Sequence, residues 1–118
     1  MERISKPEIV EKGWGKEIVI CNSPRYCGKI LVVEPGKKCS LHFHVVKHET
    51  FYLMSGLISM RTIHSDGSSE VFIMSPGDIL EVTPGLVHQF ESLEGVSQIL
   101  EVSTMHNDYD SYRIVKGD

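Results

Sequence analysis

The sequence predicts an all-β domain built as a sandwich or a barrel. Turn pairs that contain glycine recur at short intervals, as at Pro35-Gly36, Ser55-Gly56 and Asp66-Gly67. Between the turns lie runs of strand length, rich in β-branched and aromatic residues, and none is long enough to indicate a helix. These runs are KILVVE (29–34), TFYLM (50–54), LISMRTI (57–63), EVFIM (70–74), DILEV (78–82), VHQFE (87–91) and VSQILEVS (96–103). Many short strands separated by Gly and Pro turns are typical of sandwiches and barrels.

The remaining elements follow in order along the chain. We expect a helical turn in KPEIVEK (6–12), near the start. Residues 35–56 are interpreted as a strand, a loop and a second strand. The pair Asp66-Gly67 is a strong hairpin signal between two of the runs, because this dipeptide favours the tight turn that joins antiparallel strands. A second helical turn is a candidate in NDYDSYR (107–113), near the end.

Length and composition limit the classes of function that the chain can have. The chain has 118 residues, which predicts one domain over residues 1–118. Net charge is −4 and no basic face is present, so a nucleic-acid partner is disfavoured. The opening MERISKPEIVEKG lacks the apolar core of a signal peptide, and no apolar run approaches the roughly 18 residues that span a bilayer. We therefore expect a cytoplasmic protein without a membrane partner.

The three cysteines, Cys21, Cys27 and Cys39, do not predict a disulfide framework. Their number is odd and no CxxC spacing occurs, so a thiolate zinc site is not predicted either. We expect ordinary reduced cysteines on strands or in a turn.

Histidines and one glutamate predict a metal site. His42 and His44 are two residues apart, so on a strand they point to the same face. Glu49 opens the next strand, and His88 follows the turn TPG later in the chain. Ligands of a divalent metal must converge to about 2.0–2.2 Å from the ion. Imidazole with carboxylate suits one divalent transition metal, namely Zn, Fe, Mn, Ni or Co, and four protein ligands leave two octahedral positions open.

At these residues the chain resembles the cupin superfamily. The first cupin motif, G-x5-H-x-H-x(3,4)-E-x6-G, is matched by Gly36, His42, His44, Glu49 and Gly56. The second motif, G-x5-P-x-G-x2-H-x3-N, is matched by Gly77, Gly85 and His88. It departs at Thr83, where proline is expected, and at Ser92, where asparagine is expected. The resemblance implies a double-stranded β-helix, or jelly-roll barrel, with a core at about residues 29–103.

Flanking segments are similar to sugar-isomerase cupins, namely type II mannose-6-phosphate isomerases and D-lyxose isomerases. The segments are KGWGKE (12–17), CSLHFHVVKHE (39–49), in which His42 stands where that group has glutamine, and DYDSYR (108–113), which offers Asp110 and Arg113. The likeness implies an aldose–ketose isomerase acting on a sugar or sugar phosphate. It also implies a homodimer.

Other residues are candidates for substrate binding and catalysis. Phe51 shares strand parity with Glu49 and is expected to line the pocket, where it offers no proton, while Tyr52 should face the other way. Five cations could bind a phosphate: Lys37, Lys38, Lys47, Arg61 and Arg113. For each one alone, a solvated surface charge is the favoured interpretation. Glu101 lies within the apolar strand ILEVS and is our candidate for the general base, unless it faces solvent or a partner subunit. A metal-bound hydroxide is the alternative base.

The predictions for the remaining histidines and for the tryptophan are less specific. His48 is expected to orient its loop without binding the metal. His64 and His106 are expected to be solvated. Trp14 is expected to be a packed aromatic, with sugar stacking as the alternative.

Three functions remain open from the sequence. The first is the sugar isomerase. The second is a non-haem iron dioxygenase, because three histidines and a glutamate with two open positions would also bind Fe(II), dioxygen and a chelating substrate. The third is a non-catalytic module that binds a small molecule or a metal.

Overall fold

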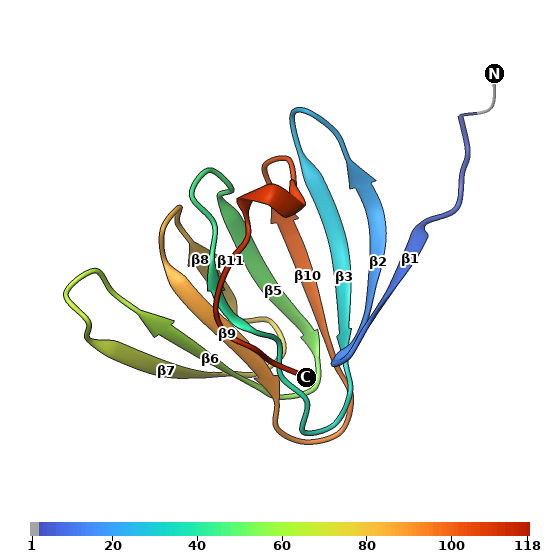
Figure 1. The fold of residues 1–118 in the computed structure, drawn as a ribbon. Coiled ribbons are helices and arrows are strands. Elements are labelled where there is room, and N and C mark those ends of the chain that lie inside the picture. Colours follow the sequence, from blue (N-terminus) through green and yellow to red (C-terminus); the bar gives the residue numbers. More distant parts are fainter. Residues whose placement is uncertain (1–2) are drawn as a thin grey trace.

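The computed structural model describes residues 3–118 as two antiparallel sheets, which confirms the all-β prediction (Figure 1). The larger sheet contains, in spatial order, β1 (Glu8–Lys12), β2 (Gly15–Asn22), β3 (Cys27–Val33), β10 (Ser97–Ser103), β5 (Glu49–Ser55) and β8 (Ile79–Val82). The smaller sheet contains β11 (Tyr112–Val115), β4 (Leu41–Phe43), β9 (Val87–Ser92), β6 (Ile58–Ile63) and β7 (Ser69–Met74). Strands distant in sequence are neighbours in both sheets, as expected of a jelly roll.

The core fills the space between the two sheets. Residues alternate along each strand, so that one side chain in two points inward. On β5, Phe51 and Leu53 are buried while Tyr52 is 40% exposed, as expected from strand parity. Trp14 packs edge-on against Phe90 with ring centroids 5.1 Å apart, so it is a packed aromatic of the core.

The segment expected to form the first helical turn is a strand instead. β1 pairs with β2 from Glu8 opposite Val19 to Lys12 opposite Gly15, so cross-strand hydrogen bonds decide the conformation of this short segment. Gly15 follows the turn with a φ of 148°, and a Cβ at this position would overlap the carbonyl of Val32. The expectation of a helix over residues 6–12 was therefore wrong.

The Asp-Gly hairpin lies where it was expected. It joins β6 to β7, which pair along their whole length. The N–H of His64 donates to the carbonyl of Ser68 at 2.8 Å, and Gly67 adopts a φ of 86°. Asp66 Oδ1 accepts the N–H of Ser68 at 2.9 Å. In Figure 1 this hairpin extends away from the rest of the fold.

The C-terminal segment folds back beside β4, the strand that carries His42. A 3-10 turn, η1 (Asp108–Asp110), begins after Asn107, whose side chain accepts the N–H of Tyr109. β11 then pairs with β4, so that Arg113 lies opposite His42. The expectation of a helical turn is met at η1, while the following residues form a strand. Across residues 3–118 we find no helix with the length and hydropathy to cross a membrane.

Candidate metal centre

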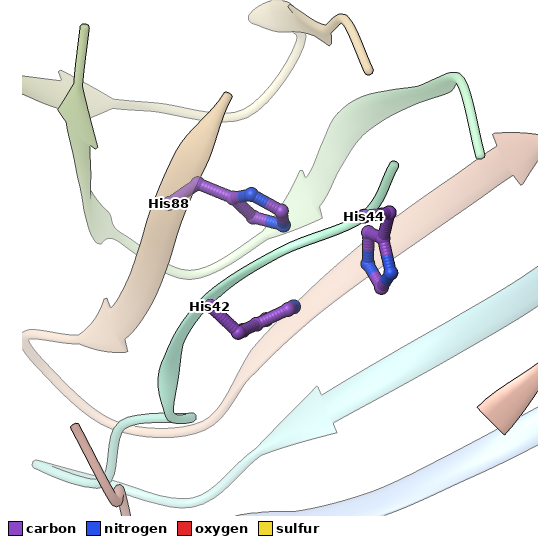
Figure 2. A group of neighbouring side chains, drawn as sticks. All are labelled: His42, His44 and His88. Carbon is purple, nitrogen blue, oxygen red and sulfur yellow. The ribbon is translucent and has the colours of Figure 1, made fainter. Parts of the chain in front are cut away.

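Three histidines converge between the sheets. His42 on β4 and His88 on β9 are direct cross-strand partners, and His44 follows two residues after His42. Nitrogen atoms of the three rings all lie within 4.8 Å of one another. Figure 2 shows the three rings pointing into a common space from two neighbouring segments. The sheet register therefore brings together the histidines that the sequence spacing selected.

Each ring is oriented by a main-chain carbonyl. The three Nδ1–O distances are 2.8 Å from His42 to Ser40, 2.9 Å from His44 to Asp110, and 2.9 Å from His88 to Leu86. A carbonyl can only accept, so each Nδ1 carries the proton and donates it. On a neutral ring this tautomer leaves the lone pair on Nε2. Orientation of this kind is what holds histidine ligands of metal ions in place.

Glu49 completes the group from the opposite sheet. Its Oε2 lies 3.2 Å from Nε2 of His44 and 3.4 Å from Nε2 of His88. The side chain is 1% exposed, and within the described part of the chain neither Glu49 Oε2 nor His88 Nε2 has a hydrogen-bond partner. Buried polar atoms without partners are costly, and a cation placed among them would satisfy both. The residues present therefore fit a metal ion.

The protonation states also suit a metal. Burial lowers the pKa of His42 to about 4 and lowers the pKa of His88, so both rings are neutral at pH 7. Burial alone would raise the pKa of Glu49. The nearby His44 ring, 3.2 Å from Oε2, and the charge of Lys47 outweigh burial and lower that pKa to about 2. Neutral imidazoles with an ionised carboxylate form a donor set for a borderline divalent ion.

A cavity of about 660 Å³ opens from this group and runs along the inner face of the larger sheet. Five lysine and arginine residues and six aspartate and glutamate residues contribute to its lining. Trp14, Phe51 and Phe90 form apolar parts of the wall. The cavity wall therefore combines apolar surface with many hydrogen-bonding side chains, some positively and some negatively charged.

Lys47 links the metal group to the cavity wall. Its Nζ lies 2.6 Å from Glu101 Oε2 and 3.8 Å from Glu49 Oε1, and it contacts Nδ1 of His106 at 3.1 Å. Burial alone would lower the pKa of Lys47, but the two carboxylates raise it, so the ammonium stays charged. The ion pair with Glu101 is thus held beside the metal ligands.

The side chain of Glu101 faces inward, as a general base that acts on a ligand in the cavity must. It is 4% exposed and lines the cavity. Its cross-strand partner on β3 is Lys29, whose Nζ lies 3.4 Å from Glu17 Oε1. Charges therefore alternate along the wall of the cavity, away from the metal group. Whether Glu101 is catalytic stays a prediction.

The predicted substrate-binding residues divide into two groups. Lys47, Phe51 and Arg113 line the cavity. Lys37 lies in the exposed turn after β3, and Arg61 is exposed on β6, where the neighbouring residues of the strand point inward. Because side chains alternate along a strand, Arg61 faces away from the cavity. A role for Lys37 or Arg61 in binding a ligand of this cavity has no support from their positions.

Two residues near the end of the chain contribute more than the sequence indicated. Asp110 accepts the N–H groups of Val45, Val46 and Lys47 at 2.9 to 3.1 Å, and its own carbonyl orients His44. His106, expected to be solvated, has a side chain only 19% exposed and contacts Lys47. The sequence singled out Asp110 only through the resemblance of DYDSYR (108–113). Polar composition alone does not indicate that this segment returns over the cavity, because that return depends on tertiary packing.

The other two histidines lie away from the metal group. The main-chain N–H of His48 donates to Thr104 Oγ1 at 3.0 Å, and its ring pairs with Glu81 at 2.7 Å while 44% exposed. His64 is 43% exposed and pairs with Glu70. The expectation that His64 is solvated was correct, and His48 anchors its loop through its main chain.

Comparisons with known proteins agree with this geometry. Residues 29–102 match the family described as "Cupin domain". An oxalate decarboxylase of Arthroderma benhamiae is 28% identical over 110 residues, which cover 91% of this chain and 25% of the relative. Oxalate decarboxylase OxdC of Bacillus subtilis is 30% identical over 97 residues, covering 77% and 25%. The chain thus spans about a quarter of the length of these curated relatives.

Solved structures give the same picture of the fold. A structure of Bacillus subtilis oxalate decarboxylase, from work on the EPR fine structure parameters of its Mn(II) centres, superposes with a TM-score of 0.82 at 18% identity. The match covers 92% of this chain and 30% of that one. At this identity the likeness establishes the fold alone.

Proposed function

The chain belongs to the cupin domain family, and on that premise we propose that it is a metal-dependent enzyme acting on a small oxygen-rich molecule. The observation that carries the proposal is the convergence of ring nitrogens from three histidines, two of which lie beside the buried carboxylate of Glu49, where two atoms have no partner among residues 3–118. The Mn(II) centres of the Bacillus subtilis enzyme support manganese as the first ion to test. The donor set suits Zn, Fe, Ni and Co as well.

The reaction we propose is aldose–ketose isomerisation of a sugar or sugar phosphate. Support comes from the cavity, which is much larger than a two-carbon acid needs and offers donors and acceptors along its wall. A divalent ion, when bound, supplies a Lewis acid that polarises a carbonyl. His42, His44, Glu49 and His88 would hold that ion.

The proton transfer is assigned to Glu101. In this proposal its carboxylate takes the proton from the hydroxyl-bearing carbon next to the carbonyl and returns it to the former carbonyl carbon, while the proton of that hydroxyl passes to the former carbonyl oxygen. Lys47, 2.6 Å away, holds the carboxylate in position and stabilises its charge. Phe51 presents an apolar surface and donates no proton. Arg113 pairs with His42 across the strands and lines the cavity, and in this proposal it would bind an anionic group such as a phosphate.

The isomerase is tested by proton NMR in D2O. Manganese-loaded protein is incubated with mannose 6-phosphate, fructose 6-phosphate or lyxose. We expect one aldose–ketose pair to interconvert with deuterium entering at C2 of the aldose and at C1 of the ketose, and Glu101→Gln to abolish this exchange while metal content is unchanged. Glu81→Gln, an exposed glutamate, is the matched control. If no pair interconverts on fully loaded protein, the isomerase is excluded. Interconversion at an unchanged rate in Glu101→Gln would remove the role of Glu101.

Decarboxylation of a small carboxylic acid is the second candidate. The similarity to two oxalate decarboxylases favours it. The assay uses 13C-oxalate and detects 13C-formate and carbon dioxide by NMR. Running every assay with and without dioxygen also separates an isomerase, which needs none, from an iron dioxygenase, which consumes it. Stoichiometric metal with no turnover in any assay would leave a non-catalytic binding module as the function.

The homodimer implied by the resemblance stays a prediction, and neither the cavity nor the metal group requires it.

A further inference from the structure

A row of charged side chains follows the inner face of the larger sheet, across the neighbouring strands β5, β10, β3 and β2 (Figure 1). The row begins at Glu49 on β5 and continues through Glu101 on β10 and Lys29 on β3 to Glu17 on β2, and all four residues line the cavity. Glu101 and Lys29 are register partners. The last pair of the row, Lys29 with Glu17, belongs neither to the metal group nor to the proposed proton transfer.

The ammonium group of Lys29 is buried but incompletely paired. Its side chain is 4% exposed, and its one hydrogen-bond partner among residues 3–118 is Glu17 Oε1, at 3.4 Å. The ammonium group of Lys47, by contrast, lies 2.6 Å from its carboxylate partner and also contacts His106. An ammonium group has three N–H donors, so two donors of Lys29 are available to a ligand in the cavity that it lines.

Stability alone accounts poorly for a charged pair at this position. Taking two charges out of water is costly, and their mutual attraction offsets that cost only where the geometry is good. The distance of 3.4 Å between Lys29 and Glu17 is longer than the about 2.7–3.2 Å of ordinary N–H···O hydrogen bonds. The register partner of Glu17 on β3 is Leu31, a residue of the hydrophobic core. A ligand that completed the hydrogen bonds of both charged groups would offset the remaining cost.

The chemistry of the pair suits hydroxyl groups better than an anion. A hydroxyl group can accept a hydrogen bond from an ammonium group and can also donate one to a carboxylate. Two neighbouring hydroxyls can therefore bridge Lys29 and Glu17 without separating them. A phosphate or carboxylate at this position would be repelled by Glu17 and by Glu101, the register partner of Lys29. Arg113, proposed above to bind an anionic group, lies on β11 of the other sheet.

The position of the pair relative to the metal group limits the kind of ligand that can reach both. Adjacent strands are ~4.8 Å apart, so β3 lies about 10 Å from β5, the strand that carries Glu49. A two-carbon acid held at the metal group has no further polar group to offer at β3. A sugar of five or six carbons carries hydroxyls on the carbons beyond its reacting end.

We propose that Lys29 and Glu17 form a subsite that binds neighbouring hydroxyl groups at the end of a sugar remote from the metal. The subsite rests on the proposed function, because its ligand is the sugar or sugar phosphate assigned there. In this arrangement the carbonyl end lies at the metal group and the remote hydroxyls lie at β2 and β3. Glu101, on β10, stands between the two ends. The pair thereby selects sugars over short acids.

Calorimetric titration of manganese-loaded protein tests the subsite with long and short probes. The long probes are mannose 6-phosphate, fructose 6-phosphate and lyxose. The short probe is hydroxyacetone, which has a carbonyl beside a hydroxyl and no remote hydroxyl. Lys29→Met and Glu17→Gln each remove a charge and roughly keep the length of the side chain. We expect each variant to raise the dissociation constant of the tightest-binding sugar about 10-fold, because hydrogen bonds to charged groups are lost, and to change that of hydroxyacetone less than about twofold.

Lys16→Met is the matched control for Lys29→Met. Lys16 precedes Glu17 on β2, so its side chain points to the opposite face of the sheet. Its replacement should leave the dissociation constants of both probes unchanged. Thermal unfolding and metal content of every variant establish that the fold and the metal group are intact, and Glu17→Gln, the milder change, serves if Lys29→Met does not fold.

Unchanged sugar affinity in the folded variants would exclude the subsite, as would a parent chain that binds no sugar more tightly than hydroxyacetone. An equal loss of affinity for the sugar and for hydroxyacetone would also overturn the proposal, because the pair would then act on the metal group. The titrations detect binding without turnover. A failed isomerase with an intact subsite would therefore be recognised as a sugar that binds through Lys29 and is not converted.

Discussion

The main-chain carbonyl of Asp110 accepts a hydrogen bond from Nδ1 of His44 at 2.9 Å, although 66 residues separate them. The carboxylate of the same residue holds three N–H groups in residues 45–47, between His44 and Glu49. One residue of the C-terminal segment therefore fixes both a candidate ligand and the loop that joins it to the next.

Asp110→Ala should weaken metal binding without unfolding the protein. The substitution removes the acceptor for three N–H groups, so the loop between two ligands becomes less ordered. Loss of such supporting contacts typically lowers metal affinity about 10- to 100-fold. Isothermal titration of metal-free protein with Mn2+ measures the change.

The control for this variant is Asp66→Ala. Asp66 also accepts a main-chain N–H in a turn, but it lies in the β6–β7 hairpin. Its replacement should leave metal affinity unchanged. Equal affinity in Asp110→Ala and the parent chain would show that the loop needs no such support.

His44→Ala should remove most of the bound metal and preserve the β fold. The ring is 5% exposed and supplies one of the converging nitrogens, so its loss leaves the ion with an incomplete set of ligands. Metal content of the purified variant, measured by mass spectrometry, checks the prediction. His64→Ala, at an exposed histidine in an ion pair, should retain the metal. Stoichiometric metal in His44→Ala would contradict the ligand assignment.

Metal-free protein should lose stability as the pH falls below the ordinary histidine range. The pKa of His42 is lowered from 6.5 to about 4, so the unfolded chain binds a proton at this position more readily than the folded chain. Stability contributed by this group is present above about pH 6.5 and is lost as the pH falls toward 4. The loss amounts to at most about 3 kcal/mol.

Urea unfolding of metal-free protein from pH 8 to pH 4 measures this dependence. His42→Gln, which cannot titrate in this range, should show a shallower decline than the parent chain. Identical profiles for the two proteins would mean that the folded environment of His42 does not disfavour its charged form.

One of the three thiols should react in the native protein. Burial raises the pKa of Cys39 to about 12 and raises the pKa of Cys27, so both are protonated and shielded at pH 8. Cys21 is only partly buried. A native titration with a thiol reagent should therefore give one fast thiol, and three after unfolding in guanidinium. Rapid modification of Cys39 in folded protein would be inconsistent with its burial.

The sequence predicted best those features that depend on local pattern. The strand runs and the Asp66-Gly67 hairpin follow from turn residues and alternation, and both occur in the structure. The spacing of His42 and His44, and the turn before His88, also predicted that the three side chains converge. The structure brings them together, because the register of β4 with β9 places His42 opposite His88.

Features that depend on tertiary pairing were missed. β1 is a strand because β2 lies beside it, and the short sequence of residues 8–12 does not by itself specify this pairing. The roles of Asp110 and His106 arise where the C-terminal segment folds back over the cavity. Lys37 and Arg61 were selected by charge alone, and charge does not specify the face on which a side chain lies.

The carbonyls that orient the three histidines also determine which changes the site tolerates. At Ser40 and Leu86 the orienting group belongs to the main chain, so a different side chain at either position would leave it in place. An inserted or deleted residue in the segments before His42 or His88 would displace the carbonyl and turn the ring. Loop length around the site is therefore constrained more tightly than residue identity at these two positions.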